Sequence, residues 1–133
     1  YNESMRLPVN KYLDFLKLNK QVKIIFVDDG STDNTKNLVN KLSETGKPIV
    51  LILISGRPMI LKPIINKCDA ILAAWLPGTE GAGISDILFG DFNPSAKLSF
   101  SWPKSMDQIP INFGDSNYDP LYKFGHGLTF KEN

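Results

Sequence analysis

The sequence predicts an α/β fold: a single, mainly parallel, doubly wound sheet of about four or five strands with helices on both faces. Two short apolar runs, residues 22–27 and 48–54, are rich in β-branched residues and show no polar alternation. Runs of this kind are typical of parallel strands that helices cover on both sides. A segment with helical periodicity lies between them, so the order strand, helix, strand predicts a βαβ unit.

The chain before residue 48 is predicted to form a helix, a strand and a second helix. Apolar residues at helical spacing, among them Val9, Leu13 and Leu16, predict an amphipathic helix over residues 8–19. The strand over 22–27 then leads into the second helix. The residues expected to shape that helix are Ser31, Thr32 and Asp33 as N-caps, Leu38, Val39 and Leu42 as its apolar face, and Gly46 as its C-terminal stop.

The same alternation continues after the strand at 48–54. The predicted elements are a helical turn over 59–65, a strand over 69–75, a helix over 79–90 and a strand over 97–102. The residues assigned within them are Thr79 as helix cap, Ile84, Ile87 and Leu88 as the inward face, Gly90 as the stop, and Leu98, Phe100 and Trp102 as one strand face. From Pro103 onward, turns and aromatic residues predict a tail that wraps back over the domain without adding regular structure. We therefore expect one flavodoxin-like domain over residues 1–133.

Composition excludes several classes of partner. The formal charge is +1, from 15 basic and 14 acidic residues spread along the chain, so we expect neither a nucleic-acid nor a membrane partner. The longest apolar run, 48–54, is too short to span a bilayer. Cys68 has no second cysteine to pair with and is expected to be a buried, inert thiol. Because the chain begins at Tyr1, we expect a fragment or a processed product, which leaves its localisation open.

Most of the chain resembles the C-terminal α/β domain of glycoside hydrolase family 3. The matching stretches are "TGKPIVLILISGRP", "DAILAAWLPGTEGAGISDILFGDFNPSAKLSFSWPKS" and "DQIPINFGDSNYDPLYKFGHGLTF", which cover residues 45–133 in the family's order. Ala96 and Ser99 depart from the glycine and proline usual there. The resemblance implies a parent hydrolase that acts on β-linked glucosides or glucans, a barrel catalytic domain as partner, and a secreted or periplasmic location.

The first forty residues resemble a different family. "YNES" followed by "KIIFVDDGSTDNT" is similar to the nucleotide-binding start of glycosyltransferase family 2, a resemblance that implies a nucleotide-sugar ligand and a cytoplasmic location. The two resemblances would meet near residues 40–46, where both families place a helix. We therefore consider a chimera, natural or engineered, of residues 1–40 and 45–133.

The first candidate ligand-binding residues are Asp28, Asp29 and Ser31. They follow a predicted strand, and ligands of open α/β sheets bind at the carboxyl ends of the strands. The helix that begins there could hold a phosphate or a sugar hydroxyl. The structural alternative is a strand-to-helix turn in which these side chains only cap the helix.

Three more candidates are Arg57, Trp75 and Glu80. Arg57 could clamp an anion, or it could pair with a carboxylate that fixes its loop. Trp75 could stack on a sugar ring, or it could belong to the core. Glu80 could act on a ligand, or it could only complement a helix dipole. The single histidine, His126, is expected to be a turn residue.

No catalytic residue can be assigned. Retaining glycosidases need two carboxyl groups about 5 Å apart, and the resemblance to family 3 places both outside this sequence. The Asp-x-Asp cluster of the transferase family is absent, and Asp115 and Asp119 do not match it. We expect neither a cofactor nor a metal. Three interpretations stay open: a non-catalytic glycosidase domain, a nucleotide-sugar-binding module, and a scaffold built or fused for its fold alone.

Overall fold

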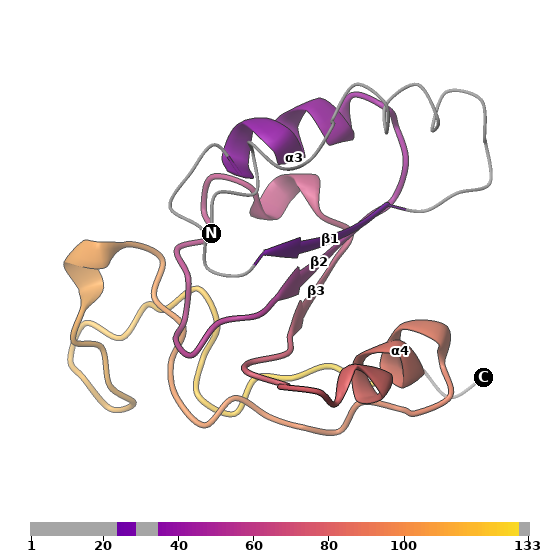
Figure 1. The fold of residues 1–133 in the computed structure, drawn as a ribbon. Coiled ribbons are helices and arrows are strands. Elements are labelled where there is room, and N and C mark those ends of the chain that lie inside the picture. Colours follow the sequence, from indigo (N-terminus) through magenta and orange to yellow (C-terminus); the bar gives the residue numbers. More distant parts are fainter. Residues whose placement is uncertain (1–23, 29–34, 131–133) are drawn as a thin grey trace. The chain divides into compact units, whose positions relative to one another are not determined.

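A computed structural model describes residues 24–28 and 35–130 of the chain. The chain folds as two compact units, Tyr1–Leu76 and Pro77–Asn133. Figure 1 shows the helices and strands that they contain. The helix expected over residues 8–19 and the caps expected at Ser31, Thr32 and Asp33 lie outside the described residues. None of the described helices is both long enough and apolar enough to cross a membrane.

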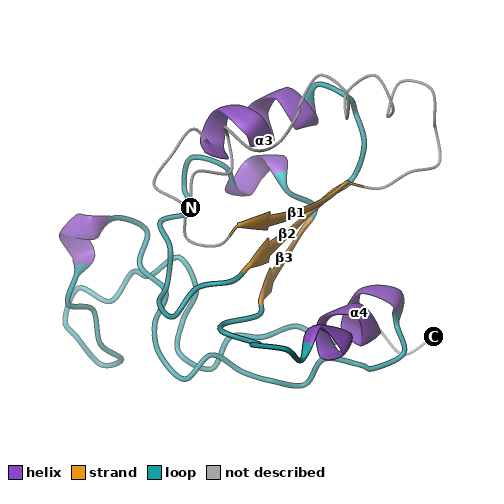
Figure 2. Ribbon diagram, viewed as in Figure 1, coloured by secondary structure: helices purple, strands orange, loops and turns teal. Residues whose placement is uncertain are grey.

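The first unit contains a three-stranded parallel sheet. Its strands are β1 (Ile24–Asp28), β2 (Ile49–Leu53) and β3 (Ala70–Ala73), in the order β1-β2-β3 (Figure 2). In the central strand Leu51 and Ile52 are both buried, although successive side chains of a strand point to opposite faces. Both faces of β2 are therefore covered, as its uninterrupted apolar run predicts. The parallel α/β fold is confirmed.

The helix of the βαβ unit is α3 (Thr35–Ser43), which lies over the strands beside the short 3₁₀ helix η1 (Ile65–Lys67) (Figure 1). Val39 and Leu42 are buried on its inner face, as their spacing predicts. The helix ends at Ser43, and Gly46 takes a left-handed φ of 65° in the following turn. Only a turn and η1 form where a helical turn over 59–65 is predicted.

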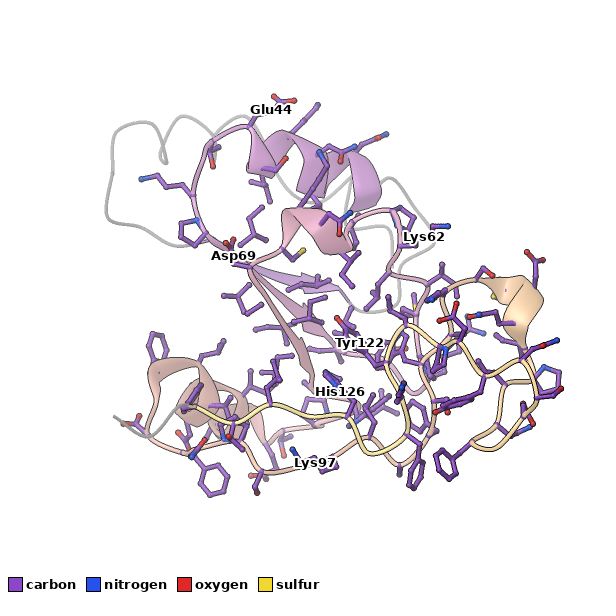
Figure 3. All side chains as sticks on the ribbon, turned by 180° about the vertical axis from the view of Figure 1, so that it is seen from behind. Glu44, Lys62, Asp69, Lys97, Tyr122 and His126 are labelled. Carbon is purple, nitrogen blue, oxygen red and sulfur yellow. The ribbon has the colours of Figure 1, made fainter. Side chains whose placement is uncertain are left out.

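The two neighbouring strands β2 and β3 are joined where they begin, by Asp69 and Ile49. The Asp69 N–H donates to the Ile49 carbonyl at 2.8 Å, and the Ile49 N–H donates to Asp69 Oδ2 at 2.8 Å. Figure 3 shows Asp69 at the end of the sheet beneath α3. A loop side chain thus completes the ladder before β3 starts.

The second unit contains α4 (Gly81–Phe89) and the 3₁₀ helix η2 (Met106–Gln108), and is otherwise irregular. Gly90 adopts φ 88° and ends α4 as predicted. The prediction of Thr79 as its cap is wrong, because Glu80 occupies the N-cap and makes no side-chain capping bond. Thr79 belongs instead to a turn that the Glu80 N–H closes on the Pro77 carbonyl. The prediction that Ile84, Ile87 and Leu88 are buried is wrong, because all three are half-exposed.

The strand predicted over 97–102 does not form, and the described sheet therefore has three strands rather than four or five. Trp102 makes only an isolated antiparallel bridge to Tyr122. The two segments also bond at Leu98, whose N–H donates to the His126 carbonyl and whose carbonyl accepts the Gly125 N–H, but between these contacts the Phe124 N–H donates to the Tyr118 hydroxyl, so no continuous ladder forms. The apolar face is still used: Trp102 is 2% exposed and its ring lies 6.3 Å from that of Phe100. The tail adds no regular structure beyond η2, as predicted.

Candidate functional site

The carboxyl edge of the three strands is the place where the sequence predicts ligand contact. Asp28 is the last residue of β1 and is in register with Leu53, which is in register with Ala73 of β3. The three strands therefore end level with one another, and the loops that follow leave from a common edge. Asp28 lies at the predicted strand end, whereas Asp29 and Ser31 lie outside the described residues.

The loop after β2 presents Arg57 to solvent. Ser55 Oγ donates to the Arg57 carbonyl at 2.9 Å and accepts the Arg57 N–H at 3.3 Å, which fixes the backbone of this turn. The Arg57 side chain is exposed, and no carboxylate among the described residues pairs with it. The Ser55 hydroxyl therefore fixes the backbone from which the exposed Arg57 side chain extends.

The loop after β3 carries Trp75 in a strained conformation. The Ala74 N–H still donates to the Leu53 carbonyl at 2.9 Å, so the ladder runs one residue past β3. Trp75 then adopts φ 55°. A bulky residue in this region costs about 1–3 kcal/mol and is found preferentially at functional sites. Its side chain is half-buried, which fits neither a full core tryptophan nor a fully exposed surface residue.

The loops that carry Arg57 and Trp75 are neighbours. A Cβ placed on Gly56 would lie 3.5 Å from Leu76 Cδ1, an ordinary contact distance. The Arg57 guanidinium and the Trp75 indole therefore lie on adjacent loops that follow the same edge of the sheet. Such a pair can hydrogen-bond to hydroxyl groups and stack on the apolar face of a sugar ring.

The chain matches the family model of the glycosyl hydrolase family 3 C-terminal domain over residues 27–130. The protein belongs to this family. A periplasmic beta-glucosidase of Salmonella typhimurium is 41% identical over 117 residues, which cover 71% of this chain and 15% of that protein. A lysosomal beta glucosidase of Dictyostelium discoideum is 40% identical over 100 residues, covering 70% of this chain and 12% of that protein. The chain thus spans a small part of the relatives it matches.

Solved structures of the family share the fold. The exo-1,3/1,4-beta-glucanase of a Pseudoalteromonas species is 43% identical with a TM-score of 0.68, covering 74% of this chain and 13% of that one. The beta-glucosidase of Listeria innocua in complex with glucose is 25% identical with a TM-score of 0.78, covering 95% of this chain and 23% of that one. The family 3 fold therefore extends well beyond residues 45–133.

The comparisons do not support the glycosyltransferase resemblance or the chimera. The family 3 match begins at Val27, inside the segment with the transferase-like wording. The Listeria enzyme superposes on nearly the whole chain, across the supposed join at residues 40–46. The stretch "VDDGSTDNT" thus starts within the family 3 domain, at the end of its first described strand.

The last candidate ligand-binding residue, Glu80, belongs to the second unit and not to the unit that contains the sheet. It is exposed at the N-cap of α4 and has no side-chain capping bond. The group at the sheet edge therefore consists of Asp28, Arg57 and Trp75. The described residues contain no cluster of three or more histidine, cysteine, aspartate or glutamate side chains that could hold a metal.

His126 and Cys68 make contacts that stabilise the fold. The His126 ring stacks on Tyr122 with centroids 4.7 Å apart and planes 13° apart (Figure 3), and its carbonyl accepts the Leu98 N–H. Cys68 is half-buried and its Sγ donates to the Ile64 carbonyl at 3.5 Å. Burial, and secondarily the charge of Asp69, raises the pKa of the Cys68 thiol, which makes it less reactive.

Three rings in the second unit form a group that no sequence pattern predicts. The Phe113 ring lies 5.8 Å from that of Tyr118 and 5.8 Å from that of Phe124. These residues are separated by irregular chain, so no periodicity links them. The only signal in the sequence is the density of aromatic residues in the tail.

Proposed function

We propose that the chain belongs to the C-terminal domain of a β-glucosidase-type hydrolase that acts on β-linked glucosides or glucans. The observation that carries this proposal is the family match over residues 27–130. Relatives named beta-glucosidase, beta-xylosidase and exo-glucanase support the substrate class. A C-terminal domain of family 3 normally sits with a catalytic barrel domain in the same chain, and such a barrel is the proposed partner.

In this proposal the domain binds sugar and the partner supplies the catalytic groups. Retaining hydrolysis needs a nucleophile and an acid/base carboxyl about 5 Å apart. Among the described residues, the sheet edge carries Asp28 at the end of β1 together with Arg57 and Trp75. We therefore assign binding rather than catalysis to this edge: the Trp75 ring would stack on a sugar and Arg57 would hydrogen-bond to its hydroxyls.

Kinetics of the full-length parent enzyme test this assignment. With an aryl β-glucoside and a β-linked disaccharide, Trp75→Ala is expected to raise KM, and Trp75→Phe, which keeps a ring, is expected to restore much of the affinity. Phe89→Ala is the matched control, because Phe89 is an aromatic residue that is 76% exposed in the second unit. Unchanged KM in Trp75→Ala would remove Trp75 from the binding site.

The isolated chain provides the second test. It is expected to hydrolyse no aryl β-glucoside, and activity is expected to require the barrel domain. Hydrolysis at enzyme-like rates by the isolated chain would show that a catalytic pair lies within it and would overturn the division of labour. A parent enzyme without activity on any β-glucoside, β-xyloside or β-glucan would overturn the substrate class.

We further propose that the parent protein works in the periplasm or outside the cell. The Salmonella relative is named a periplasmic enzyme, which supports this location. Fractionation of cells that express the parent gene, with immunodetection of this domain, tests it. Recovery with the cytoplasmic fraction alone would contradict it.

A further inference from the structure

The three rings of Phe113, Tyr118 and Phe124 form a surface that we call the aromatic platform. Phe113 lies in the middle, edge-on to Tyr118 at an interplanar angle of 88° and tilted by 40° to Phe124. Phe113 is 73% exposed and Phe124 is 51% exposed. The rings contact one another but remain largely open to solvent, and exposed apolar groups of this kind mark binding surfaces.

Hydrogen bonds fix the orientation of the platform. The Tyr118 hydroxyl bonds to Ser101 Oγ at 2.8 Å and accepts the Phe124 N–H at 2.9 Å. Ser101 is the one buried polar residue among the described residues, at 7% exposure. Tyr118 therefore connects the platform to the interior of the second unit and holds two of its three members in place.

The loop on which the platform stands is tied down at its base. Lys104 pairs with the carboxylate of Asp119, and the Gln108 side chain donates to the Asp119 carbonyl and accepts the Lys104 N–H. These bonds join the start of the loop to the segment just after Tyr118. A surface held in this way loses little conformational entropy when a ligand binds.

The rim of the platform is polar and nearly balanced in charge. Asn112, Asp115 and Asn117 are exposed beside the rings, and Asp115 Oδ2 accepts the Asn112 N–H, which closes their turn. Lys123 is exposed next to Phe124 in the sequence. Amide and carboxylate groups suit hydroxyl donors, and the absence of a strong charge of one sign in this segment favours a neutral ligand over a phosphate-bearing one.

We propose that the aromatic platform binds a β-linked glucan chain, with the Phe113 face stacked on a glucose ring. The choice of a β-glucan rests on the proposed function, and the choice of a neutral polyhydroxyl ligand rests on the rings and their rim. The site would hold polymeric substrate through the second unit. Other apolar side chains of that unit, such as Phe89, make no described ring contacts and are not part of it.

Affinity electrophoresis of the 133-residue chain tests the platform. The gels contain soluble mixed-linkage β-glucan, or dextran as the α-linked control. We expect β-glucan, but not dextran, to retard the chain. Phe113→Ala is expected to weaken retardation about tenfold or more, Phe113→Trp to keep it, and Phe89→Ala to leave it unchanged. Near-ultraviolet circular dichroism of each variant verifies that the unit stays folded.

Several results would overturn the proposal. One is that β-glucan does not retard the unsubstituted chain, and another is that dextran retards it equally. A third is that Phe113→Ala and Phe89→Ala weaken the retardation by the same amount. A dimer that Phe113→Ala converts to a monomer would assign the platform to self-association. A full-length enzyme in which Phe113→Ala lowers Tm without changing glucan retardation would assign it to an interdomain contact. Normal hydrolysis by the full-length enzyme, without retardation of the chain by β-glucan, would rule out glucan binding by the platform but would agree with the proposed function.

Discussion

Asp69 and Ile49 exchange two hydrogen bonds, both of 2.8 Å, one through the Asp69 backbone and one through its carboxylate. The pair closes the ladder between β2 and β3 at the end where regular pairing has not yet begun. Ile49 is 1% exposed, so water cannot readily replace the carboxylate as the partner of its N–H.

Asp69→Ala is therefore expected to lower the free energy of unfolding by about 1–3 kcal/mol, because it leaves a buried N–H without its acceptor. Asp69→Asn keeps an acceptor oxygen and should recover part of the loss. Urea denaturation followed by circular dichroism measures both. Glu44→Ala, at an exposed position in the same unit, is the control and should be neutral. If Asp69→Ala were as stable as the unsubstituted chain, the hydrogen bond between Asp69 and Ile49 would not stabilise the fold.

Two glycine-to-alanine changes in the second unit are expected to have opposite signs. A Cβ on Gly127 would collide with the Ala96 carbonyl oxygen, so the backbone must shift and the substitution should cost about 1–3 kcal/mol. A Cβ on Gly83, inside α4, meets nothing within 4 Å. Gly83→Ala should stabilise by up to about 1 kcal/mol, because alanine favours the helix. Thermal unfolding of both variants checks the sign, and a neutral Gly127→Ala would show that the tail does not pack closely there.

The hydrogen bond between Ser101 and Tyr118 is expected to appear as a coupling energy. Tyr118→Phe removes the partner of a buried hydroxyl and of the Phe124 N–H, at a cost of about 1–2 kcal/mol. In Ser101→Ala the same change should cost less, because the buried hydroxyl is already gone. A double-mutant cycle in urea measures the difference, and additive effects of the two changes would mean that the bond contributes nothing to stability.

The Cys68 thiol should titrate above an ordinary cysteine. Burial and the Asp69 charge raise its pKa, so the folded state binds the thiol proton more tightly than the unfolded state does. This contribution to stability is present below the ordinary thiol pKa and is lost as the pH rises through the folded-state value. The rate of alkylation by iodoacetamide as a function of pH measures the shift, with the same chain in urea as the reference. Coincident profiles would rule it out.

The sequence predicts those parts of the fold that local chemistry determines. The apolar run of β2 marks a strand because burial on both faces leaves no polar position, and Gly90 ends α4 because a left-handed residue is needed there. The parallel α/β class follows from these elements alone. The segment 97–102 has the alternation of a strand, but a strand also needs a continuous ladder, and here its partner bonds at Leu98 and Trp102 while the Phe124 N–H between them donates to the Tyr118 hydroxyl.

The candidate site was predictable only in part, for the same reason. Strand ends can be located from the sequence, so Asp28 and the loops of Arg57 and Trp75 fall at the expected edge. The backbone conformation of Trp75 cannot be derived from its residue type, because tryptophan seldom adopts positive φ. The platform joins Phe113 to Phe124 through Tyr118, whose hydroxyl is held by Ser101, and such long-range contacts leave no periodic trace.

The hydrogen bonds that tie the tail to residues 93–102 impose an order on biosynthesis. The three strands of the first unit are complete once Ala73 has left the ribosome, whereas Trp102 waits for Tyr122, and Asn93 waits for Phe130, whose N–H it accepts. During translation Trp102 therefore lacks its bridge to Tyr122 until some twenty further residues have been made, an interval in which a nascent chain is open to aggregation and to chaperones. A premature stop before Tyr122 would remove that bridge, together with the edge-on contact of the Tyr122 ring with the indole.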